Sequence, residues 1–182
     1  MTTAPADRVS DLGRAADELG EVVAVERLGG GMVEVAARLP HAAACARPGE
    51  FLQLRCGPPP VPLLRRPFSV AWVEGDICAV VFEPVGEGTR RLAALRPGDR
   101  LAALGPLGRG FTVPAGGRVV CVAGGLGCAP FPLAARRARQ AGAAEVVVLH
   151  GAATAERLYP AARFARGDAA VRVVEATDDG GR

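Results

Sequence analysis

Apolar residues fall into short runs separated by glycine and proline through the first two thirds of the chain. Five such runs have the length and β-branched content of strands, at residues 21–25, 32–38, 51–56, 70–73 and 77–82. A sixth, at 101–104, follows a single helical segment at 89–95. Glycine and proline between the runs supply the turns of an antiparallel sheet. The pattern predicts an antiparallel β-barrel or sandwich that ends near residue 113.

The pattern changes after residue 114, where longer apolar runs begin to alternate with helical segments. The expected order is strand, helix, strand, helix and strand, at residues 118–123, 131–141, 145–150, 155–165 and 171–176. Apolar strands joined by helices indicate a parallel sheet covered on both faces. The predicted fold class is therefore β plus α/β. It has an N-terminal extension at 1–19, an antiparallel β-barrel domain at 20–114 and a parallel-sheet nucleotide-binding domain at 115–182.

Composition narrows the class of protein without identifying it. The chain has 182 residues, of which 49% are hydrophobic, and a formal net charge of +3. Its arginines are scattered rather than gathered in a stripe, so nucleic-acid binding is not expected. The first 20 residues carry charges of both signs, and the longest uncharged run, 119–135, is cut by glycine and proline. We therefore expect no secretion signal, no membrane span and a cytoplasmic protein.

Cysteine and serine usage limits the available chemistry. The five cysteines form no C-x-x-C pair and are expected to be reduced thiols packed as small apolar residues: Cys45, Cys56, Cys78, Cys121 and Cys128. The only serines are Ser10 and Ser69, and neither has a histidine and a carboxylate nearby in the sequence. Hydrolysis by a serine nucleophile is therefore not expected.

The densest group of candidate binding side chains is Leu63-Leu64-Arg65-Arg66-Pro67-Phe68-Ser69-Val70. Its residue types suit a flat, anionic cofactor. Arg66 can form paired hydrogen bonds to a diphosphate, Phe68 can lie against a conjugated ring, and the Ser69 hydroxyl can hydrogen-bond a ring nitrogen or oxygen. The alternative interpretation is an ordinary Arg-Arg-Pro turn that leads into an edge strand.

A second candidate site follows the strand at 118–123. Gly124-Gly125-Leu126-Gly127 would let a pyrophosphate approach backbone amides ahead of the helix at 131–141. The same glycines fit a tight strand-to-helix turn, because their spacing is not G-x-G-x-x-G. His150 and Asp178-Asp179 end the next two strands at the same carboxyl edge of the sheet. Each of them is either a ligand contact or a structural residue.

Several motifs occur in a fixed order: Arg66-Pro67-Phe68-Ser69, Gly86-Glu87-Gly88-Thr89, Arg96-Pro97-Gly98-Asp99, Gly105 to Phe111, Ala123 to Pro130 and Thr177 to Gly180. The first resembles the Arg-x-(aromatic or aliphatic)-Ser flavin motif of the ferredoxin reductase superfamily. The ordered set, over residues 20–182, resembles the electron-transfer subunit of the NAD-dependent (class 1B) dihydroorotate dehydrogenase.

The resemblance implies that FAD binds to the barrel and that NAD(H) is the co-substrate. The implied flavin contacts are Arg66, Pro67, Phe68, Ser69, Val81, Phe82, Glu83, Gly88 and Thr89, with Ser69 as the catalytic residue near the reactive edge of the flavin. Gly124, Gly125 and Gly127 would hold the pyrophosphate of NADH. Glu83 departs from the family pattern, which has a basic residue there, and a carboxylate cannot pair with phosphate.

The family continues with further strands and helices and with a cysteine cluster that holds a [2Fe-2S] centre. The cysteines of this chain lie in other elements, so we expect no cluster ligands and no other metal site in it. We expect the chain to be truncated at its C-terminal end, and the nucleotide-binding domain to be partial. The strand at 118–123 would then be an exposed edge, which would lower solubility.

The resemblance also implies a partner, the FMN-containing catalytic subunit of dihydroorotate dehydrogenase, in a hetero-oligomer of pyrimidine biosynthesis. Two alternatives keep part of this interpretation. The chain could serve another oxidoreductase, such as a sulfhydrogenase, as its ferredoxin-reductase-type subunit. It could also be a non-catalytic remnant or binding module.

Overall fold

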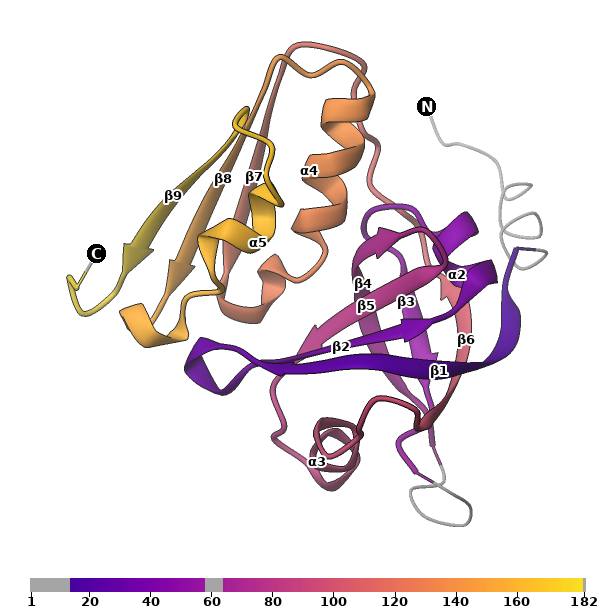
Figure 1. The fold of residues 1–182 in the computed structure, drawn as a ribbon. Coiled ribbons are helices and arrows are strands. Elements are labelled where there is room, and N and C mark those ends of the chain that lie inside the picture. The colour runs from indigo at the N-terminus through magenta and orange to yellow at the C-terminus, as the bar shows by residue number, and fades with distance from the viewer. Residues whose placement is uncertain (1–13, 58–63, 182) are drawn as a thin grey trace, which may run out of the picture.

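The computed structural model describes residues 14–57 and 64–181. Most of the predicted N-terminal extension therefore lies outside the described residues, as do Pro58-Pro59-Pro60 and Leu63. The described chain forms a closed barrel of six antiparallel strands, followed by a three-stranded parallel sheet with helices (Figure 1). The predicted fold class is confirmed.

The barrel strands are hydrogen-bonded in the order β1-β2-β5-β4-β3-β6. Their bounds are β1 Ala16–Arg27, β2 Val33–Arg38, β3 Phe51–Leu54, β4 Arg66–Glu74, β5 Ile77–Phe82 and β6 Arg100–Leu107. Two short helices connect them, α2 Pro40–Cys45 and α3 Glu87–Ala93. The strand β1 begins inside the segment predicted as an extension. The hydrophobic pattern does not predict α2, because six residues make fewer than two helical turns.

Both faces of β4 are buried, and this explains how the barrel joins the second unit. Phe68, Val70 and Val73 point into the barrel core. Ala71 and Trp72 belong to a second apolar cluster, which they share with residues after position 120. An irregularity in the pairing of β4 with β5 falls between Val70 and Trp72, and at this point the consecutive residues Ala71 and Trp72 both join the second cluster.

The parallel sheet has the order β7-β8-β9, with bounds Arg118–Gly124, Glu145–Ala152 and Val171–Thr177. Helices α4 Phe131–Gln140 and α5 Ala161–Ala165 lie between this sheet and the barrel (Figure 1). The strand β7 forms one edge of the sheet, as predicted. The other sheet face exposes four apolar side chains, Val120, Val122, Leu149 and Val174.

Coverage of both sheet faces is therefore a wrong prediction for the described part of the chain. The reason is topological. Right-handed crossovers between strands that follow one another in the same direction place their helices on one face of the sheet. Helices on the second face require strands added on the other side of β7, and residues 14–57 and 64–181 contain none.

The helix predicted at 155–165 is also partly wrong. The segment begins with a 3₁₀ turn at Ala155–Arg157, and α5 starts only at Ala161. Pro160 stands between them. It has no backbone N–H to continue a helix, and it disfavours helical geometry in the preceding residue, Tyr159. None of the described helices is long and apolar enough to cross a membrane.

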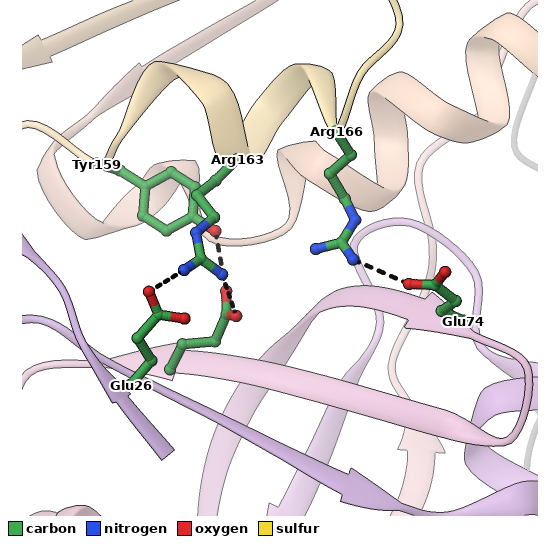
Figure 2. A network of polar contacts seen from close by, with 6 residues as sticks. Glu26, Glu74, Tyr159, Arg163 and Arg166 are labelled. Carbon is green, nitrogen blue, oxygen red and sulfur yellow. Dashed lines mark hydrogen bonds and ion pairs between the residues drawn. The ribbon is translucent and has the colours of Figure 1, made fainter. Parts of the chain in front are cut away.

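A buried carboxylate joins the barrel to the α/β unit. Glu34 of β2 is 4% exposed. It accepts hydrogen bonds from Arg163 of α5 at 2.7 Å and from the Tyr159 hydroxyl at 3.2 Å (Figure 2). Arg163 also pairs with Glu26 of β1. Because Arg163 and Tyr159 both come from the α/β unit, the network fixes α5 against the first two strands.

A second arginine of the same region contacts the barrel near its outer surface. Arg166 pairs with Glu74 at 3.0 Å (Figure 2). Its guanidinium also lies 4.1 Å from the centre of the Trp72 ring. This is a cation–π geometry, and it adds to the contact between the two units.

The hairpin between β1 and β2 touches the α/β unit through Gly30. Gly30 has φ +66°, and a Cβ there would lie 2.6 Å from the Cα of Arg157 and 2.8 Å from the carbonyl oxygen of Glu156. Gly31 has φ +80°, but a Cβ there would meet nothing within 4 Å.

We expect Gly31→Ala to lower the free energy of unfolding by about 1–2 kcal/mol through left-handed backbone strain alone. Gly30→Ala should cost more, because the clash adds to the same strain. Urea denaturation measures both, and equal losses would contradict the contact.

Candidate functional site

The two adjacent arginines of the central stretch differ in what they contact. The Arg65 guanidinium pairs with Asp17 of β1 at 2.7 Å and also donates to the carbonyl oxygen of Gln53. The Arg66 side chain is exposed and donates only a long hydrogen bond, 3.4 Å, to the carbonyl oxygen of Arg65. Among the described residues no carboxylate pairs with Arg66. Arg66, rather than Arg65, is therefore available to an anion.

Pro67, which follows Arg66 on β4, lines a cleft of about 430 Å³, which we call the barrel-side cleft. It brings together many of the residues predicted to contact a flavin. The lining residues are Pro67, Phe68, Ser69, Val81, Phe82, Glu83, Val85, Thr89, Leu126 and Ala129. The last two come from the α/β unit, so the cleft lies where the two units meet. Arg66 and Gly88 are not among the lining residues.

Phe68 is largely used by the barrel core. Its side chain is 8% exposed, and its ring centre lies 5.1 Å from that of Phe82 at an angle of 53°. A ligand in the cleft could therefore contact only the small part of the Phe68 ring that lines it. Ser69, the next residue on β4, is half-buried and also lines the cleft. Stacking by Phe68 and a catalytic role for Ser69 stay predictions.

The motif Gly86-Glu87-Gly88-Thr89 forms the start of α3. The Thr89 hydroxyl accepts a hydrogen bond from the Gly86 N–H and donates one to the Gly86 carbonyl oxygen, both at 3.0 Å. A Cβ on Gly86 would meet nothing within 4 Å. The Thr89 hydroxyl proton is therefore used within the turn, while the space in front of Gly86 is open.

A second cleft, of about 400 Å³, lies at the carboxyl ends of the parallel strands, and we call it the sheet-side cleft. Its lining residues are Glu83, Gly124, Gly125, Leu126, Gly151, Ala152, Ala153, Arg157 and Asp178. Gly125 has φ +50°, which favours glycine, and Cβ atoms on Gly124, Gly125 or Gly127 would meet nothing within 4 Å. The structure thus brings Gly124, Gly125 and Asp178 together, while Gly127 does not line the cleft.

The two clefts share one wall, because Glu83 and Leu126 line both. The Glu83 carboxylate accepts hydrogen bonds from Arg157 at 3.2 and 3.3 Å. The hydrophobic pattern gives Arg157 no role, because this residue falls inside the segment predicted as one helix. An arginine 74 positions from its partner leaves no local pattern that could reveal the pair.

His150 is buried and forms a hydrogen bond to the backbone of the glycine loop. It is 1% exposed, and its Nε2 lies 3.2 Å from the carbonyl oxygen of Gly125. Burial lowers the pKa of His150, so the neutral form, with the proton on Nε2, accounts for this hydrogen bond. The ring also meets Phe164 edge to face at 5.6 Å. Of the two interpretations of His150, these contacts favour the structural one.

The cysteines are packed as the sequence predicts. All five are free thiols, four of them buried and Cys45 partly exposed. Cys128, next to the glycine loop, is fully buried, and burial raises its pKa to about 12. A thiol with this pKa is protonated at neutral pH and is a poor nucleophile.

The fold indicates the class of protein to which the chain belongs. No known family profile matches the sequence. The structure is similar to the NADH-dependent reduced ferredoxin–NADP oxidoreductase, with a TM-score of 0.73 and 25% sequence identity over 87% of this chain and 57% of that one. The barrel followed by the parallel sheet is the fold of the ferredoxin reductases.

Sequence similarity is more specific. Over 144 residues the chain is 40% identical to the electron transfer subunit of dihydroorotate dehydrogenase B (NAD(+)) from Desulforamulus reducens, which covers 78% of this chain and 54% of the relative. The subunit from Geobacillus thermodenitrificans is 38% identical over 138 residues, 73% of this chain and 52% of its own. The chain is a homologue of this subunit, which confirms the predicted resemblance. It spans about half the length of the curated relatives that it matches.

Proposed function

We propose that the chain transfers electrons, by means of a bound flavin, between NAD(H) and the catalytic subunit of a dihydroorotate dehydrogenase in pyrimidine biosynthesis. The observation that carries this proposal is the wall of Glu83 and Leu126 that the two clefts share. Ligands bound in both clefts would meet at that wall. The names of the relatives, which specify electron transfer and NAD(+), support the same function.

FAD is the ligand that we propose for the barrel-side cleft. The lining offers an apolar wall from Pro67, Phe68, Val81 and Phe82, and the half-buried Ser69 hydroxyl beside it. Arg66, whose side chain is exposed, directly precedes the lining residue Pro67 on β4. An apolar wall, a hydroxyl and a free cation fit a ligand with a conjugated ring and an anionic diphosphate. When bound, FAD supplies the chemistry of taking up a hydride and releasing electrons one at a time.

NAD(H) is the ligand that we propose for the sheet-side cleft. Gly124 and Gly125 present backbone without side chains at the carboxyl edge of the sheet, where ligands bind in open α/β folds. The work of the protein is then to bind, to orient and to exclude water at the shared wall. Ser69 would hold the flavin ring by a hydrogen bond from its hydroxyl.

The proposed function also requires a partner subunit that exchanges electrons with this chain. It would be an FMN-containing catalytic subunit, joined to this chain in a cytoplasmic hetero-oligomer. Within residues 14–57 and 64–181 no three His, Cys, Asp or Glu side chains come together as metal ligands. No step is therefore assigned to a [2Fe-2S] centre in this part of the protein. Co-purification with a co-expressed dihydroorotate dehydrogenase catalytic subunit would distinguish this partner from that of another oxidoreductase.

The visible absorption spectrum of the purified chain, mixed with FAD and then desalted, tests the flavin site. We expect a protein-bound flavin spectrum. Arg66→Ala should weaken FAD binding about tenfold or more, because charged hydrogen bonds contribute about 1.5–3 kcal/mol each. Arg137→Ala is the matched control, since the half-buried Arg137 side chain hydrogen-bonds Gln140 on its own helix and pairs with no carboxylate among the described residues.

Two results would count against the proposal in different ways. If the unsubstituted chain retains no flavin, the proposed function is contradicted and a non-catalytic binding module is favoured. If Arg66→Ala and Arg137→Ala retain flavin equally, the diphosphate does not bind at Arg66.

A further inference from the structure

At the wall between the two clefts, the residue at position 83 has the opposite charge to the one that the resemblance implies. Glu83 stands at the end of β5, where the resemblance leads us to expect a basic residue. A cation is nevertheless present, because the Arg157 guanidinium lies against the Glu83 carboxylate at 3.2 and 3.3 Å. It comes from the α/β unit rather than from the barrel.

The barrel fixes Arg157 at both ends. Its backbone packs so closely against the β1–β2 hairpin that a Cβ on Gly30 would lie 2.6 Å from the Arg157 Cα. Its guanidinium is held by Glu83. An arginine restrained at both ends loses little additional conformational entropy when it binds a ligand, so Arg157 is preorganised.

Arg157 keeps hydrogen-bonding capacity after pairing with Glu83. Both contacts to the carboxylate come from one nitrogen, Nη2. A guanidinium has five N–H donors, so those on Nε and Nη1 are not used by Glu83. The Arg157 side chain is 53% exposed and lines the sheet-side cleft together with Gly124 and Gly125. Three N–H donors of a cleft-lining side chain are therefore not used by Glu83, and the neighbouring backbone glycines leave open space.

Charge selects the kind of ligand group. Among the described residues that line the sheet-side cleft, Arg157 is the one cationic side chain. The other charged lining groups are the carboxylates of Glu83 and Asp178. An anion in this cleft would be repelled by both carboxylates, so its most favourable position is beside Arg157 and the glycine backbone.

We propose that Arg157 is a phosphate-binding residue of the sheet-side cleft, positioned across the interface by Glu83, and that it contacts the diphosphate group of the pyridine dinucleotide. This inference rests on the proposed function, because it assigns the anion contact of the nucleotide site. Because Glu83 belongs to the barrel and Arg157 to the α/β unit, contact between the two units would then contribute to nucleotide affinity.

Two neutral substitutions separate anion binding from a merely structural ion pair. Arg157→Gln and Glu83→Gln remove the same ion pair, so a structural role predicts equal effects. Anion binding by Arg157 predicts opposite effects. Glu83→Gln keeps an oxygen that accepts from Nη2 and removes a competing negative charge, whereas Arg157→Gln removes the cation.

The measurement is isothermal titration of the FAD-supplemented full chain with NADH, and with ADP, which carries a diphosphate but no nicotinamide. We expect Arg157→Gln to weaken binding of both ligands about tenfold or more. Glu83→Gln should bind both more tightly. Urea denaturation of the two variants, with equal midpoints, checks that their folds are matched.

The outcomes distinguish this inference from the proposed function. Opposite changes in the two variants support Arg157 as the phosphate contact. Equal weakening in both, or unchanged binding in Arg157→Gln, would overturn it while leaving the nucleotide site in place. If the unsubstituted chain binds neither NADH nor ADP, the proposed function and this inference both fail.

Discussion

Replacing Arg163 by methionine is expected to lower the free energy of unfolding by about 3 kcal/mol. The Glu34 carboxylate is 4% exposed and has two partners in the α/β unit, Arg163 at 2.7 Å and the Tyr159 hydroxyl at 3.2 Å (Figure 2). Methionine keeps the apolar stem of the side chain but leaves a buried carboxylate with one neutral donor. We expect the lower end of the range for a broken buried ion pair, because the Arg163 side chain is 24% exposed and water can enter.

Urea denaturation followed by circular dichroism measures this loss. Arg137→Met is the control, because Arg137 hydrogen-bonds the exposed Gln140 and pairs with no carboxylate among the described residues, and its effect should stay within about 0.5 kcal/mol. Adding Glu34→Gln to Arg163→Met should recover much of the stability, because a buried amide needs no counter-charge. Equal unfolding midpoints for Arg163→Met and Arg137→Met would contradict a stabilising role of the network.

The strands could be predicted because their signal is local. The segment Ile77–Phe82 is apolar, β-branched and bounded by a Glu74-Gly75-Asp76 turn, and β5 has these bounds in the structure. The change from short strands to alternating strands and helices, expected near residue 114, falls in the segment between the end of β6 at Leu107 and the start of β7 at Arg118. Such features depend on neighbours within a few positions, so one sequence contains them.

Features that depend on distant parts of the chain could not be predicted in the same way. The helix expected at 155–165 has helical composition, but Pro160 and the burial of Tyr159 against the barrel interrupt it. Coverage of the sheet depends on strand order, which the hydrophobic pattern does not specify. The side on which a helix packs is a property of the topology.

The candidate site shows the same division. Pro67, Phe68 and Ser69 could be proposed as one group because they are adjacent in sequence, and in the structure they line one cleft. The sequence shows that Glu83 replaces the basic residue expected at this position. It does not show that Arg157 is the ion-pair partner of Glu83, because pairs across an interface follow no short spacing in sequence. The chemical meaning of a charged residue at an interface therefore depends on the second unit.

The second large effect is expected from valine at two open glycines. Gly124 has φ −106° and ψ 133°, and Gly86 has φ −128° and ψ 173°, which are extended conformations that valine adopts without strain. A Cβ at either position would meet nothing within 4 Å. Each substitution should therefore leave the fold intact and fill space that we assign to a ligand.

The two variants should separate the two sites. Gly124→Val should weaken NADH binding roughly ten- to a hundredfold, the equivalent of about 1–3 kcal/mol of overpacking, and should retain FAD. Gly86→Val, beside Gly88 and Thr89, should weaken FAD instead. Titration with each ligand measures both affinities, and a denaturation midpoint for each variant tests its fold. Loss of both ligands in both variants would contradict separate sites, because Gly124 lines only the sheet-side cleft, while Gly86 lies in sequence between Val85 and Thr89, which line only the barrel-side cleft.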